Sequence, residues 1–153
     1  MRIDLRPATP GDYDFCRNLY FAENDWILEA LGLDRAAHEA LFPELWKVSE
    51  VRLIVPGGKE IGWLQIEAQT GALFLGQIYI VRSSQRHGIG TEVLRHIIAE
   101  AAAAHLPLKL DVAKINPALR LYQRLGFQII SEEQHKFNLT LEPASADSLH
   151  PTP

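Results

Sequence analysis

The hydrophobic positions of the chain repeat with two different periods, and each period predicts one kind of element. Apolar residues at every second position predict strands, because successive side chains of a strand point to opposite faces. Strands are expected at 3–7, 51–55, 61–68, 73–81, 108–114, 127–130 and 136–141. A proline followed by two glycines at 56–58 separates the second strand from the third, which is typical of an antiparallel meander.

Apolar residues at helical spacing predict two helices before the meander. The first starts near Gly11, where Thr9 and Asp12 have the spacing of a capping box, and continues into the twenties. The second begins at the capping residue Asp34. It is expected to bend or restart at Pro43, because proline lacks the amide hydrogen that a helix interior requires.

Two more helices are expected after the meander. The segment 89–105 carries its apolar residues on one face and predicts a strongly amphipathic helix. Asn116 and the proline after it start a short helix that ends at Gly126, since glycine readily adopts a left-handed conformation. The strand 108–114 returns after a helical crossover, so we expect it to pair in parallel with 73–81.

This order of elements predicts an α/β (α+β) fold. It consists of a mixed, mostly antiparallel sheet of about seven strands, flanked by about four helices around one core. The predicted domain covers 1–141. The tail 142–153 is rich in proline, serine and alanine and is expected to be disordered.

The composition is that of one ordinary soluble domain. The chain has 153 residues, of which 47% are hydrophobic, enough for a single core. No apolar run approaches the roughly 18 residues that cross a bilayer, and the first residues lack an apolar signal core. We therefore expect a cytoplasmic protein without a membrane partner. The net charge of -4 argues against a nucleic-acid partner.

The acidic residues are concentrated in one segment. Residues 21–50 hold seven acids and two bases, a net charge of 2 - 7 = -5, so the rest of the chain is near neutral. Such a segment favours a cationic substrate, such as a polyamine, an aminoglycoside or a basic peptide terminus. The alternative is that these acids lie on the solvated faces of helices.

Several other side chains have simple structural interpretations. Cys16 follows a phenylalanine on a predicted helix and is expected to be a small buried hydrophobe rather than a nucleophile. Trp26 and Trp46 could line an acceptor cleft, although aromatic core packing is the commoner role. The histidines at positions 38, 96, 105 and 135 lack the spacing of metal ligands, and no metal site is predicted.

The loop 82–91 carries the first candidate chemistry, because it joins a strand to the start of the amphipathic helix. Gly88 and Gly90 let the backbone turn and let an anion approach the amides. The free amides and the positive end of the helix dipole would then bind a phosphate, with Arg82 and Arg86 adding charge. Glycines that merely tighten a turn are the alternative interpretation.

The spacing in this loop excludes two other phosphate-binding motifs. A dinucleotide-binding fold requires a third glycine where Val93 stands. A P-loop requires lysine and a hydroxyl residue where the chain has Thr91 and Glu92.

A second motif gives the loop its interpretation. The pattern Gln85-x-x-Gly88-x-Gly90 follows a strand that ends Ile-Tyr-Ile-Val, and it precedes Asn-Pro-Ala-x-x-Leu-Tyr-x-x-Leu-Gly-Phe at 116–127. Together they resemble the GNAT superfamily of N-acetyltransferases over roughly residues 3–141. The resemblance implies that the two central parallel strands splay apart to hold acetyl-CoA as cosubstrate. It also implies direct attack of a primary amine on the thioester through a tetrahedral intermediate, and it makes a homodimer plausible.

The resemblance also implies roles for individual residues. Backbone amides near Ile80 and Val81 would bind the acyl carbonyl and pantetheine, and the side chain of Asn116 would meet the pantetheine arm. Tyr122 would protonate the departing thiolate, or else it is a core residue with its hydroxyl at the rim. The cofactor loop would consist of Arg82, Gln85, Arg86, His87, Gly88, Ile89, Gly90 and Thr91, with the pyrophosphate on the amides of 86–91.

The general base is where this chain departs from the family pattern. Many relatives have a glutamate on the strand before the phosphate loop, and here the candidate is Gln77, which cannot accept a proton. Water held by Gln77, or an acid such as Glu23, Asp25 or Glu29, could replace it. The departure also keeps open a second function, that of a non-catalytic acyl-CoA-binding module.

Overall fold

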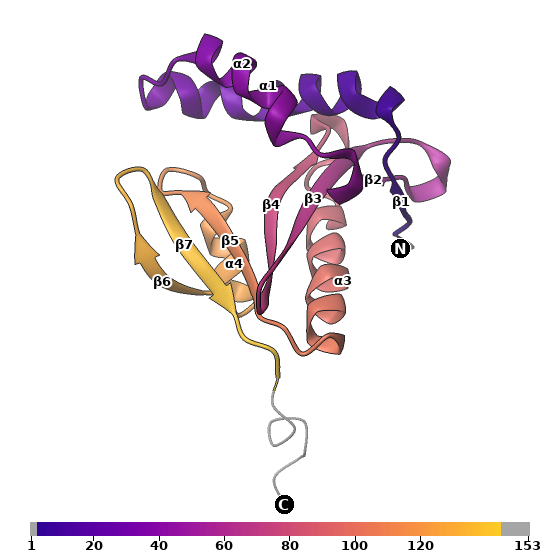
Figure 1. The fold of residues 1–153 in the computed structure, drawn as a ribbon, viewed down its shortest axis with the longest axis vertical. Coiled ribbons are helices and arrows are strands. Elements are labelled where there is room, and N and C mark those ends of the chain that lie inside the picture. The colour runs from indigo at the N-terminus through magenta and orange to yellow at the C-terminus, as the bar shows by residue number, and fades with distance from the viewer. Residues whose placement is uncertain (1–2, 145–153) are drawn as a thin grey trace, which may run out of the picture. The chain divides into compact units, whose positions relative to one another are not determined.

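The computed structural model describes residues 3–144, and within them it contains a seven-stranded mixed sheet and four α-helices (Figure 1). The strands are β1 (Leu5–Pro7), β2 (Val51–Ile54), β3 (Gly62–Gln69), β4 (Ala72–Ile80), β5 (Leu108–Ala113), β6 (Gln128–Glu132) and β7 (Lys136–Leu141). The helices are α1 (Tyr13–Ala30), α2 (Arg35–Leu45), α3 (Ile89–Ala103) and α4 (Leu119–Arg124). The predicted fold class is confirmed.

The sheet order is β1-β2-β3-β4-β5-β7-β6, with β4 and β5 as the one parallel pair. The crossover through α3 is the connection that parallel pairing requires. No helix in the described part of the chain is long and apolar enough to cross a membrane. The predicted disordered tail lies, from residue 145 onward, outside the described residues.

The predicted capping box lies on a single turn of 3-10 helix, Pro10–Asp12, that leads directly into α1. Asp12 accepts a hydrogen bond from the backbone amide of Thr9 at 2.8 Å, and the amide of Asp12 donates to the Thr9 carbonyl at 3.0 Å. The same carboxylate accepts two hydrogen bonds from the Arg6 guanidinium, at 2.9 and 3.0 Å. These bonds join β1 to the first helical turn, and the Arg6 hydrogen bonds lower the pKa of Asp12 from 3.8 to about 2.

We expect Asp12→Asn to destabilise the protein by about 1–2 kcal/mol near neutral pH. The pKa of Asp12 is lower in the folded chain, so its contribution is complete above about pH 4 and is lost as the pH falls towards 2. Urea unfolding at several pH values measures this difference. Asp14→Asn, an exposed carboxylate in the first turn of α1, is the matched control, and an equal loss in both variants would contradict the prediction.

Helix α2 corrects one part of the expectation for Pro43, because the helix does not restart there. The helix begins where predicted, with the Asp34 side chain accepting from the amide of Ala36 at 3.0 Å, but it continues through Pro43 to Leu45. No second helix starts at the proline. Because Pro43 lies two residues from the end, it removes only one hydrogen bond near a terminus, where a lost bond costs least.

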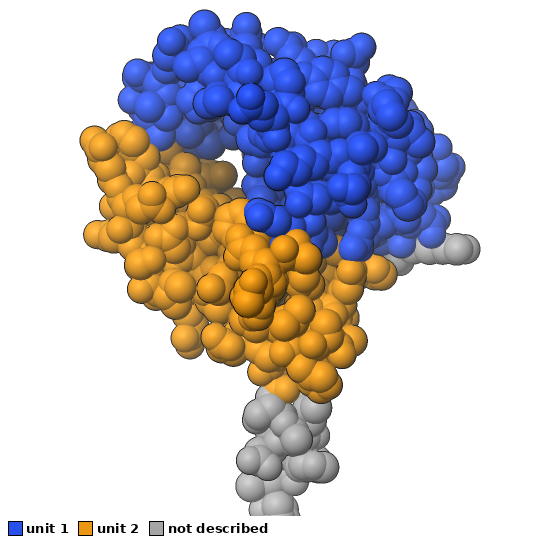
Figure 2. Space-filling view, viewed as in Figure 1, with its two compact units in different colours: residues 1–67, 75–93 blue, residues 68–74, 94–153 orange. Residues whose placement is uncertain are grey.

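The chain divides into two compact units, coloured separately in Figure 2. The first contains residues 1–67 and 75–93 and has a core between helices α1 and α2 and the strands beneath them. Cys16, Leu53 and Trp63 are fully buried in this core. Burial raises the pKa of the Cys16 thiol to about 11, in agreement with its predicted role as a buried hydrophobe.

The second unit contains residues 68–74 and 94–153 and is built on the antiparallel pairing of β7 with both β5 and β6. Leu108, Leu110 and Val112 of β5 are buried, at every second position as the period predicts. The bulge between Ile129 and Ser131 interrupts the register of the β6–β7 pair.

Candidate functional site

The loop after β4 has the backbone geometry of an anion site. Gly88 has φ 79°, in the left-handed region where glycine is favoured, and a Cβ added there would meet nothing within 4 Å. The first helical bond runs from the Glu92 amide to the Gly88 carbonyl at 3.0 Å. The amides of residues 89–91 precede this bond, so they have no acceptor within the helix. They lie at the positive end of the α3 dipole.

The conformation of Arg86 was not foreseen from the sequence. Its φ of 65° is also in the left-handed region, which non-glycine residues seldom adopt. The loop therefore turns at Arg86 as well as at Gly88. Arg82, Arg86 and His87 are all exposed. Two exposed guanidinium groups, those of Arg82 and Arg86, thus bring positive charge to the loop.

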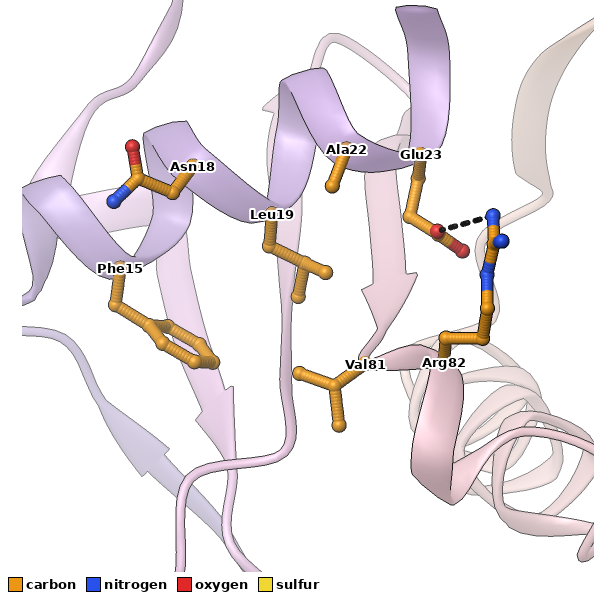
Figure 3. Close-up of a pocket in the computed structure, with 7 residues that line it drawn as sticks. All are labelled: Phe15, Asn18, Leu19, Ala22, Glu23, Val81 and Arg82. Carbon is orange, nitrogen blue, oxygen red and sulfur yellow. Dashed lines mark ion pairs between the residues drawn. The ribbon is translucent and has the colours of Figure 1, made fainter. Parts of the chain in front are cut away.

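Gln85 contributes to the loop through contacts within the protein. Its side-chain amide donates to the backbone carbonyl of Ile80 at 2.7 Å and also to the carboxylate of Glu23 on α1. The side chain that begins the predicted motif thus links the end of β4 to helix α1. The carboxylate of Glu23 also lies 4.0 Å from the Arg82 guanidinium (Figure 3).

The end of β4 places the predicted acyl-binding residues beside this link. The Val81 amide donates to the Ile61 carbonyl at 2.7 Å, so an acyl carbonyl would have to compete for it. Gln77 accepts a hydrogen bond from the hydroxyl of Tyr79, whose ring packs on Trp63 at 5.4 Å between centroids. The oxygen of Gln77 is therefore occupied, and the side chain remains unable to take a proton.

The second unit holds the other two predicted residues. The Asn116 side-chain oxygen accepts from the amide of Ala118 at 2.9 Å and shapes the turn before α4. Tyr122 on α4 packs edge-on against Phe127, with 5.9 Å between ring centroids. Burial raises the pKa of Tyr122 to about 12, so the phenol keeps its proton at neutral pH. Its role as an acid stays a prediction.

A cavity of about 540 Å³ opens beside the loop, between α1 and the end of β4 (Figure 3). Its lining residues are Phe15, Asn18, Leu19, Ala22, Glu23, Val81 and Arg82. Five of them are on one helix, at the spacing of three and four residues that aligns side chains on one face. The sequence shows that these five residues share one helix face. The cavity itself depends on how α1 packs beside the end of β4, which the sequence does not show.

Three acids of α1 were candidates for the general base, and one lines this cavity. Asp25 accepts a hydrogen bond from Arg35 at 2.8 Å, and Glu29 is exposed on the helix surface. Trp46 is a core residue, 8% exposed, and Trp26 is 45% exposed. Neither tryptophan lines the cavity, and Trp46 has the commoner role of core packing.

Comparisons with known proteins identify the fold and the family of the chain. Among curated proteins, no sequence matches the chain. A structure of PaiA N-acetyltransferase from Thermoplasma acidophilum in complex with coenzyme A superposes with a TM-score of 0.75, at 13% identity over 93% of this chain and 99% of that one. An acetyltransferase from Thermus thermophilus superposes with a TM-score of 0.70, at 20% identity over 93% and 97% of the two chains.

N-acetylglutamate synthase from Neisseria gonorrhoeae, complexed with coenzyme A and N-acetyl-glutamate, is a larger relative in structure. It superposes with a TM-score of 0.67 at 18% identity, over 95% of this chain and 36% of that one. These likenesses establish the fold. A family model described as an acetyltransferase (GNAT) domain matches residues 47–129, more than half of the sequence, including the loop and Tyr122. The chain therefore belongs to the GNAT acetyltransferase family.

Proposed function

We propose that the protein transfers the acetyl group of acetyl-CoA to a primary amine. The observation that carries the proposal is the loop after β4, where the amides of 89–91 have no acceptor within α3, the space beside Gly88 is open, and Arg82 and Arg86 are exposed. These features fit a pyrophosphate, which needs amide donors and positive charge. The family match over the same loop and the coenzyme A complexes of structural neighbours support the choice of cosubstrate.

Acetyl-CoA would be held by the loop through its pyrophosphate and by Asn116 through its pantetheine arm. The amine nitrogen would attack the thioester carbonyl, and the tetrahedral intermediate would collapse as the carbon–sulfur bond breaks. Backbone amides near Ile80 would stabilise the charge on the carbonyl oxygen. Tyr122 would give its proton to the departing thiolate, and the phenol is protonated at neutral pH.

The second candidate function is acyl-CoA binding without turnover, and Gln77 is the observation that favours it. The experiment that decides between the two combines acetyl-CoA with a panel of primary amines and measures free thiol. For an acetyltransferase we expect thiol release that depends on the amine and a product that is heavier by one acetyl group. If acetyl-CoA raises the melting temperature but no amine releases thiol, the chain is a binding module.

A further inference from the structure

The cavity between α1 and the end of β4 combines an apolar wall with three polar side chains, the carboxylate of Glu23, the guanidinium of Arg82 and the amide of Asn18. Phe15, Leu19, Ala22 and Val81 supply apolar surface, and Glu23 is the carboxylate among the lining residues (Figure 3). A cavity of this composition suits a ligand with an apolar body and a single cationic group. A hydrophilic polycation would leave its other charges against apolar side chains, at a cost in desolvation.

The Glu23 carboxylate is held in place by one hydrogen bond, and its second oxygen can accept another. One oxygen accepts from the Gln85 amide, and the other lies 4.0 Å from Arg82, beyond hydrogen-bonding distance. Within the described residues this second oxygen has no hydrogen-bond donor. The Glu23 side chain is 20% exposed, whereas that of Arg82 is 83% exposed and well solvated. The carboxylate can therefore accept a further hydrogen bond in surroundings partly shielded from water.

The position of Glu23 relative to β4 is set by Gln85. The same side-chain amide of Gln85 bonds Glu23 and the carbonyl of Ile80, so one amide group separates the carboxylate from the strand end. Val81, the next residue, lines the cavity. An amine bound by Glu23 would thus lie next to the strand end assigned to the acyl group in the proposed function.

We infer that this cavity binds the acceptor, a primary monoamine with an apolar body, and that Glu23 is the catalytic residue that receives its proton. The inference rests on the proposed acetyl transfer. The ammonium loses one proton through Glu23 to solvent, and the nitrogen lone pair then forms the bond to the acyl carbon. The second nitrogen proton passes to Glu23, while the carbon–sulfur bond breaks and the thiolate takes the Tyr122 proton. Glu23 releases this second proton to solvent, and solvent returns one proton to Tyr122, so the net products are amide, CoA thiol and one proton.

The first test compares Glu23→Gln with the wild type, using 2-phenylethylamine as acceptor. We expect kcat/KM to fall by about 100-fold or more, while acetyl-CoA binding measured by calorimetry changes less than twofold. The loss should shrink towards pH 10, because the amine is then already free of its first proton and only the second has to pass to Glu23. Glu29→Gln, on the exposed surface of α1, is the matched control and should behave as wild type. If kcat/KM of Glu23→Gln were reduced by the same factor at every pH, Glu23 would have a structural role, and its assignment as the base would be overturned.

The second test concerns the apolar wall. Ala22→Leu fills the cavity, so the KM for 2-phenylethylamine should rise at least tenfold while that for ethanolamine changes little. Ala37→Leu, an exposed alanine on α2, is its control. A wild-type preference for spermidine or ethanolamine over 2-phenylethylamine would overturn the inference.

If the proposed acetyl transfer is wrong, the experiments give a different result from the one that overturns the cavity assignment. In that case no amine releases thiol from the wild type, and the cavity is judged by binding alone. Calorimetry should then still detect 2-phenylethylamine binding that Glu23→Gln and Ala22→Leu both weaken. Equal binding to all three proteins would overturn the inference as well.

Discussion

Tyr122→Phe should lower kcat by about 100-fold or more and leave the stability of the protein almost unchanged. The phenylalanine ring keeps the packing against Phe127. Within the described residues the Tyr122 hydroxyl has no hydrogen-bond partner, so its removal leaves no buried group unsatisfied. Only the proton for the departing thiolate is lost. Single-turnover kinetics, combined with thermal unfolding, measures both effects.

The pH dependence of the wild type gives an independent check. A proton donor must be protonated, and burial extends the protonated range of Tyr122 up to a pKa of about 12. We therefore expect no fall in kcat from this group below about pH 11. Tyr13→Phe, at a partly buried residue that packs against the core of the first unit, is the control for removal of a tyrosine hydroxyl. Unchanged turnover in Tyr122→Phe at saturating substrates would exclude the acid role.

Gly62→Ala, at the start of β3, should be strongly destabilising because the added methyl group meets the end of β4. A Cβ at Gly62 would lie 2.3 Å from the Tyr79 carbonyl oxygen and 3.2 Å from the Ile80 Cα. Both are backbone atoms, so one strand has to move. We expect a loss of about 3 kcal/mol, which lowers the melting temperature by about 6–12 °C. Acetyl-CoA should also bind more weakly, because the displaced backbone is the one proposed to face the acyl group.

Gly11→Ala is the matched control, since a Cβ there would come no closer than 3.8 Å to the Thr9 hydroxyl. Its φ lies outside the left-handed region, so the alanine should be neutral or slightly stabilising. A melting temperature for Gly62→Ala equal to that of the wild type would show that the two strands can separate at this point without cost.

The sequence predicted the elements well where one period ran without interruption. The period of two over β5 and the helical period of α3 identified both elements, because each buries one face of a regular repeat. Pro43 was misjudged for a related reason, since a rule for helix interiors was applied to a residue near a helix end. The local sequence pattern does not predict the residue at which a helix ends to within two positions.

The candidate site was predictable only in part. The glycine spacing of the loop indicated an anion site. In the structure, Arg86 and Gly88 adopt left-handed conformations there, and the first amides of α3 have no acceptor within the helix. The bond from Gln85 to Glu23 could not be anticipated, because it joins residues 62 positions apart through the packing of α1. The left-handed Arg86 carries no sequence signal either, since arginine does not favour that conformation.

The burial of Cys16 has a practical consequence for all these measurements. It is the only cysteine in the chain, and it is 0% exposed within the core of the first unit. An aromatic disulfide reagent added to the folded protein should therefore find no accessible protein thiol, and the colour that develops during turnover reports coenzyme A alone. After denaturation the same reagent counts one sulfur per unfolded chain. A variant that is folded but inactive therefore shows no protein thiol, whereas an unfolded variant shows one, and the same titration distinguishes the two.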